Sequence, residues 1–126
     1  MGVGAGVEGV GQVAIPVQDI ARSTAFYRDV LGLALLFEAG TLAFFDGGGV
    51  RLMFSEDDRS EGIAAPLLYY RSADLEAAHE SLVANGVAVE SDPHVVHRDE
   101  RHELRMGFYR DPDDHLFGIM QEVPLG

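Results

Sequence analysis

The chain has 126 residues, 47% of them hydrophobic and 24% charged, which suits one globular domain with a sizeable core and argues against overall disorder. Its formal net charge of −12 argues against a nucleic-acid partner, because phosphates would be repelled. The acidic surface either keeps the protein soluble or steers a cationic small molecule to it. No cysteine is present, which excludes disulfides, thiolate metal sites and a cysteine nucleophile.

The N-terminal segment, residues 1–8, is rich in glycine and valine, and we expect it to be a flexible tail. It lacks the basic segment and the long apolar run of a signal peptide. The sequence offers no run approaching the roughly 20 apolar residues of a membrane-spanning helix. We therefore predict a cytoplasmic protein without a membrane partner.

A strand, a helix and three further strands are predicted in the first half of the chain. Asp19 can cap the helix, apolar residues then recur at helical spacing, and Gly32 is a natural stop. Short β-branched and aromatic runs separated by glycine turns predict the strands. In chain order, these elements are a strand at 12–17, a helix at 20–31, and strands at 33–39, 41–45 and 50–55.

The same order recurs after a charged segment, 57–64, which we interpret as a solvated linker. The second set comprises a strand at 66–71, a helix at 74–84, and strands at 87–91, 103–109 and 115–122. The repeat predicts an α+β fold of two βαβββ modules, at 9–56 and 65–123, within a single domain at 9–126. Neither module alone buries both faces of its sheet, so two modules must pair, within one chain or across a dimer.

Two segments resemble the vicinal oxygen chelate superfamily, which includes glyoxalases, bleomycin-resistance proteins and extradiol dioxygenases. Residues 13–32 are similar to its opening, where a strand leads through an Asp to a helix that carries Ser, Phe-Tyr and a closing Leu-Gly. Residues 108–113, Phe-Tyr-Arg-Asp-Pro-Asp, resemble its closing signature. The resemblance extends over about residues 10–123.

This resemblance implies that the curved mixed sheets of the two modules pair to form a cup. The superfamily's lyases, epimerases and dioxygenases hold a divalent metal in the cup, whereas its bleomycin-resistance-type members hold a drug there without metal. Dimers are usual in the superfamily, so a homodimer is expected.

The metal positions implied by the resemblance lie on the first and fourth strands of each module. They fall on Gln12, on or beside Leu52, near Leu67 and near Gly118. Glutamine is a weak neutral donor, and leucine and glycine side chains cannot bind a metal. A shift of one residue at the last three positions supplies no ligand. We therefore expect no metal cofactor.

Strand alternation predicts a mainly apolar cup with a few polar groups, which suits a small organic ligand. The alternative is that these residues form ordinary sheet core. The predicted ligand-binding residues are Gln12, Leu52, Phe54, Leu67, Tyr69, His97, His102, Met106, Gly118 and Met120.

Three histidines and several acids crowd into the stretch from His94 to Glu103. His102 and Met106 share one face of the following strand, and Glu103 lies on the other. If this strand borders the cup, His102 and Glu103 are candidate catalytic residues, and His97, His102 and Glu103 are candidate ligands of a non-standard divalent metal. The mixed charges instead favour an exposed hairpin. A register slip of one residue would exchange the roles of His102 and Glu103.

Residues 111–114, Asp-Pro-Asp-Asp, concentrate three carboxylates, but they have the composition of a turn. The 12-residue spacing and terminal Glu of a calcium loop are missing.

The sequence leaves two functions open. The first is a glyoxalase/bleomycin-resistance-like protein that binds a small apolar or cationic molecule, such as an antibiotic or another natural product that it sequesters, in a cup without the usual metal. The alternative is a lyase, isomerase or dioxygenase of the same superfamily that uses the cluster of His97, His102 and Glu103, with or without a divalent metal.

Overall fold

The computed structural model describes residues 4–56 and 64–126. Most of the predicted linker and the first three residues of the predicted tail lie outside the described residues. No helix among the described residues is both long and apolar enough to span a bilayer.

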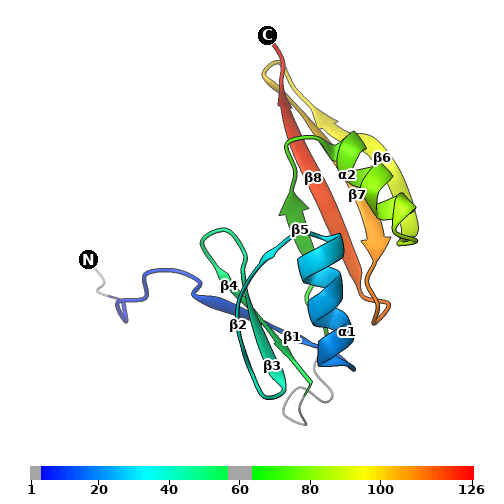
Figure 1. The fold of residues 1–126 in the computed structure, drawn as a ribbon. Coiled ribbons are helices and arrows are strands. Elements are labelled where there is room, and N and C mark those ends of the chain that lie inside the picture. The colour runs from blue at the N-terminus through cyan, green and yellow to red at the C-terminus, as the bar shows by residue number, and fades with distance from the viewer. Residues whose placement is uncertain (1–3, 57–63) are drawn as a thin grey trace.

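Two successive sets of elements make up the chain (Figure 1). The first set comprises β1 (Gln12–Pro16), α1 (Ile20–Ala25), its π-helical continuation η1 (Phe26–Val30), β2 (Ala34–Ala39), β3 (Leu42–Asp46) and β4 (Arg51–Ser55). The second set comprises β5 (Leu68–Arg71), α2 (Leu75–Ala84), β6 (Ala88–Arg98), β7 (His102–Arg110) and β8 (Leu116–Pro124). The largest difference from the sequence prediction is β6, which continues as a strand through His94 and His97 instead of ending at Ser91.

Each set folds into a four-stranded mixed sheet with the same strand order. The orders are β1-β4-β3-β2 and β5-β8-β7-β6. In both sheets the first strand of the module is parallel to its last, and the remaining neighbours are antiparallel. The α+β fold of two βαβββ modules is therefore confirmed.

The two helices begin and end by the same local chemistry. The carboxylates of Asp19 and Asp74 each accept a hydrogen bond, 3.1 Å long, from the backbone N–H three residues further on. Such caps satisfy donors that the first helical turn leaves without partners. Gly32 and Gly86 follow the helices at φ of 84° and 77°, where a side chain would be strained.

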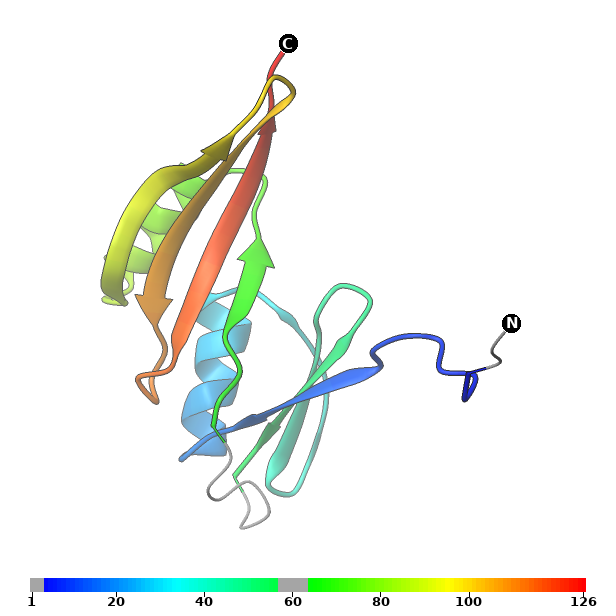
Figure 2. The same ribbon diagram turned by 180° about the vertical axis from the view of Figure 1, so that it is seen from behind.

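The α1–η1 helix lies between the two sheets and packs on both of them (Figures 1 and 2). The Tyr27 ring lies 4.4 Å from the ring of Phe54 in the first sheet and 6.5 Å from that of Tyr70 in the second. Phe26 contacts Phe117 of β8 edge-on at 6.0 Å. These rings belong to one continuous core, so the two modules share a hydrophobic interior.

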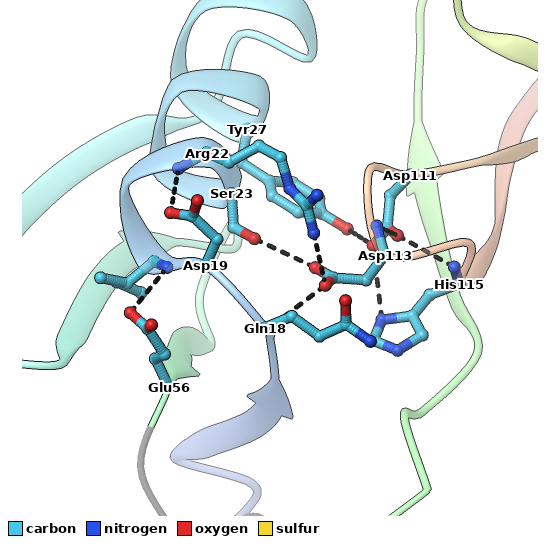
Figure 3. A network of polar contacts seen from close by, with 10 residues as sticks. Gln18, Asp19, Arg22, Ser23, Tyr27, Glu56, Asp111, Asp113 and His115 are labelled. Carbon is cyan, nitrogen blue, oxygen red and sulfur yellow. Dashed lines mark hydrogen bonds and ion pairs between the residues drawn. The ribbon is translucent and has the colours of Figure 1, made fainter.

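A set of polar contacts, which we call the joint, ties the α1–η1 helix to the β7–β8 turn (Figure 3). The Tyr27 hydroxyl donates to Asp111 Oδ2 at 2.6 Å. Asp113 accepts from the Arg22 guanidinium at 2.9 Å and from the Ser23 hydroxyl at 3.2 Å. The side chains of both aspartates are only 1% exposed. Buried carboxylates are costly unless donors surround them, so the joint holds the modules together only as a complete set.

Burial holds the pKa of Tyr27 far above its usual value, and the negative charge of Asp111 adds to the effect. Burial likewise raises the pKa of Tyr70. The Tyr27 hydroxyl therefore stays protonated, and it remains a donor to Asp111 at any pH that the folded chain tolerates.

Replacing Tyr27→Phe should lower the free energy of unfolding by about 1–3 kcal/mol, because Asp111 Oδ2 loses its donor inside the core. The folded pKa of Tyr27 lies above the value near 10 of an unfolded tyrosine. Wild-type stability should therefore be complete below that pH and fall as the pH rises above it. Tyr27→Phe should weaken this alkaline loss.

Urea unfolding monitored by circular dichroism between pH 7 and pH 11 measures both effects. Tyr69→Phe, which removes an exposed hydroxyl, is the matched control. Equal stability of the Tyr27→Phe and Tyr69→Phe variants would contradict the importance of the joint.

Candidate functional site

Each sheet has one face covered by its helix and one face without a helix, which we call the open face. In the first module, Ile15, Leu52 and Phe54 point to the helix and are almost completely buried. Gln12 lies on the open face as predicted, next to Met53. The predicted placement of Leu52 and Phe54 in the cup is therefore wrong, because the alternation of β4 is shifted by one residue and turns Arg51 and Met53 outward.

The open face of the second module carries four of the predicted ligand-binding residues. Tyr69 is opposite Gly118 in the strand register, and Met106 is opposite Met120. Leu67 precedes β5 and is exposed. Phe108, which the sequence prediction missed, lies opposite Gly118 on the same face.

Gly118 leaves room for an aromatic ring on this face. A Cβ atom at Gly118 would lie 2.7 Å from Cδ1 of Tyr69 and 3.3 Å from Cε1 of Phe108. The Tyr69 and Phe108 rings meet edge-on there at 5.8 Å. Glycine within a strand often marks such a close approach, so the sequence did contain this signal.

The remaining predicted residues lie at the far end of the second sheet. His97 and His102 flank the β6–β7 turn, which projects away from the first module (Figure 1). Their side chains are more than half exposed, and their ring nitrogens lie 3.4 Å and 4.0 Å from Asp99. Backbone N–H donors from the turn hold the pKa of Asp99 below its usual value.

Glu103 points to the opposite, helix-covered face of β7. It is 5% exposed and forms ion pairs with Arg105 at 2.6 Å and Arg98 at 3.3 Å. The structure therefore brings together neither the predicted catalytic pair of His102 and Glu103 nor the alternative metal site of His97, His102 and Glu103. Adjacent residues of a strand point to opposite faces, and this separates them.

Among the described residues, one group of acids and a histidine is close enough to hold a metal, namely Asp111, Asp113 and His115. Every carboxylate oxygen of this group already accepts a hydrogen bond from the protein. Asp111 Oδ1 accepts from the backbone N–H groups of Asp113 and His115, and Asp113 Oδ1 also accepts from the backbone of Gln18. Together with the side-chain donors of the joint, these hydrogen bonds make the group a structural cross-link between the modules (Figure 3).

The residues at the metal positions implied by the resemblance do not fit a divalent cation. Gln12 Oε1, the one oxygen donor, accepts a hydrogen bond from Arg51 Nε at 2.8 Å. The Arg51 guanidinium lies over the Phe44 ring at 5.1 Å, so a metal at Gln12 would face a fixed positive charge. Leu52 points into the core, Leu67 is apolar and Gly118 has no side chain.

A groove lies between the β3–β4 turn of the first sheet and β5 of the second sheet. Its volume is about 630 Å³, within the usual range for small-molecule sites. Two smaller hollows of about 390 and 300 Å³ adjoin it and share Arg71 with it. The residues lining the groove are Gly32, Leu33, Ala34, Asp46, Gly47, Gly48, Tyr69, Tyr70, Arg71 and Met120.

With this geometry established, comparison with known proteins gives the family. Residues 9–119 match the family model described as "Glyoxalase/Bleomycin resistance protein/Dioxygenase superfamily". The chain belongs to this superfamily. The solved superfamily member from Sphaerobacter thermophilus DSM 20745 superposes with a TM-score of 0.76 at 18% identity, over 91% of this chain and 98% of that one. TioX from Micromonospora sp. ML1 superposes with a TM-score of 0.73 at 16% identity, over 91% and 99%.

Two sequence relatives match very different shares of the chain. The protein YraH of Bacillus subtilis is 30% identical over an alignment that spans 125 positions and covers 86% of this chain and 94% of YraH. The metallothiol transferase FosB of Staphylococcus epidermidis is 39% identical over 51 residues. These cover 40% of this chain but only 37% of FosB, so the similarity reaches little more than a third of the length of that enzyme.

Substituting Gly118→Ala should cost about 1 kcal/mol of stability, because the new methyl group overlaps the Tyr69 ring. In a Tyr69→Ala background the same substitution should cost markedly less. The coupling energy of this double-mutant cycle, measured by denaturant unfolding, tests the packing. Purely additive effects would show that the two residues do not touch.

Proposed function

We propose that this protein binds a small organic molecule in the groove between its modules, without a divalent metal at the position of Gln12. The observation that carries the proposal is the Tyr69 ring, which packs across Gly118 and yet is 45% exposed in the groove. An exposed aromatic ring beside the thioether of Met120 offers an apolar surface for a ligand, and Asp46 and Arg71 supply polar groups in the same groove.

Binding without turnover is supported by what the groove lacks. Its described lining contains no histidine and a single carboxylate, Asp46, which accepts a hydrogen bond from the backbone of Gly48 at 2.8 Å. The enzymatic alternative depended on His102 and Glu103, and these point to opposite faces of β7. We therefore favour sequestration of an organic compound, such as an antibiotic or another natural product. A homodimer in solution remains a prediction.

The proposal is tested by screening natural products and drug-like compounds for an increase in the melting temperature, followed by calorimetric titration of the compounds that bind. A ligand that binds only the folded state raises the melting temperature by mass action. Tyr69→Ala should weaken binding by about tenfold or more, corresponding to about 1.4 kcal/mol. Treatment with a chelator should leave the affinity unchanged.

His102→Ala is the control, because its exposed side chain lies at the β6–β7 turn, outside the groove. Loss of binding in His102→Ala with retention in Tyr69→Ala would place the site elsewhere and contradict the proposal. Loss of binding on chelation would contradict its metal-free character.

A further inference from the structure

Arg71 is one of two described arginines, with Arg101, whose side chains have no described partner. The sequence contains no lysine, so all nine of its cationic side chains are arginines. Among the eight that the structure describes, five form ion pairs with carboxylates, and Arg51 is held by Gln12. The Arg71 side chain has no hydrogen bond or ion pair with any described residue, although 21 acidic residues are available in the chain.

The position of Arg71 is also particular. It follows Tyr70, whose side chain packs against the core, and it therefore points to the open face of β5. Its Nη2 atom lies 3.5 Å from the place that a Cβ atom on Gly48 would occupy, so the side chain reaches from the second module to the β3–β4 turn of the first. Arg71 lines the groove and both adjoining hollows.

We propose that Arg71 recognises an anionic group, a carboxylate or a phosphate, on the organic ligand of the groove. This inference rests on the proposed function and narrows its ligand to an apolar molecule with a negative end. A guanidinium presents a planar fork of donors that matches either group with two parallel hydrogen bonds. Tyr69 and Met120 lie beside it and would contact the apolar part of the same molecule.

The acidic net charge does not oppose this assignment at contact distance. Exposed charges are screened over about 8 Å at physiological ionic strength, so most of the acidic surface has little effect on a group bound directly to Arg71. The described acids that line the groove and the adjoining hollow are Asp46 and Glu122, and neither forms an ion pair with Arg71. Net charge alone left two readings open, a solubilising surface or the steering of a cationic molecule, whereas the local geometry at Arg71 favours an anion.

The test uses probes matched in shape and different in charge: naphthalene-2-carboxylate, the neutral naphthalene-2-carboxamide, and 2-naphthyl phosphate. Each is titrated into the full chain, and the dissociation constant and the location of binding are read from backbone amide NMR shifts. One or both anions should bind about 10- to 100-fold more tightly than the amide, with the shifts centred on Tyr69, Arg71 and Met120.

Arg71→Gln should abolish this preference and bind the three probes about equally. Arg101→Gln is the matched control, because it removes another arginine without a described partner, at the β6–β7 turn outside the groove. It should keep the wild-type preference. Arg71→Lys keeps the charge but lacks the planar set of guanidinium donors, so its preference for the anions over the amide should be intermediate. This variant replaces Arg71→Gln if Arg71→Gln does not fold.

The possible failures are distinct. If the probes bind in the groove but the amide binds as tightly as both anions, or if Arg101→Gln reduces the preference as much as Arg71→Gln, the role of Arg71 is overturned and the proposed function stands. If no probe shifts the groove resonances, both are overturned. If Arg71→Gln changes only the self-association of the chain, Arg71 contacts a second copy of the chain. The anion proposal is then overturned.

Discussion

The hydrogen bonds that the α1–η1 helix donates to the β7–β8 turn fix the position of one half of this protein relative to the other. Asp111 and Asp113 are almost completely removed from water, and each of their oxygens accepts from a donor. Separating the modules would strip donors from two buried carboxylates and expose the shared aromatic core at the same time. The joint and the aromatic packing of Tyr27 together determine where β5 lies relative to the first sheet.

The groove follows from that arrangement. Each helix covers one face of its sheet, and the other face stays open, so the residues where β5 approaches the first module are left without a covering element. Tyr69 and Arg71 occupy this position, and Gly118 provides the space that the Tyr69 ring requires. The proposed site thus depends on the size of Gly118, the exposed ring of Tyr69 and the charge of Arg71.

The sequence predicted the repeat well because its signals are local: an aspartate cap and a glycine stop recur at corresponding positions, and runs of apolar residues mark the strands. The prediction failed in β4, where Leu52, Met53 and Phe54 are all apolar. Without alternation of polar and apolar residues, the sequence does not indicate which side chains face the core. The proximity of His102 and Glu103 along the chain suggested a shared site, yet neighbours in a strand diverge. Arg71 was missed because its surroundings are set by how the two modules pack, and no local sequence pattern reveals which residues lie around it.

Pairing of the modules within one chain underlies both the joint and the groove, and isotope-filtered NMR tests it most directly. In a mixture of carbon-13-labelled and unlabelled chains, the Phe26 and Phe117 rings, 6.0 Å apart, should give nuclear Overhauser effects within the labelled chain and none between labelled and unlabelled chains. Effects seen only between chains would show that the modules pair across a dimer, and they would contradict the site described above.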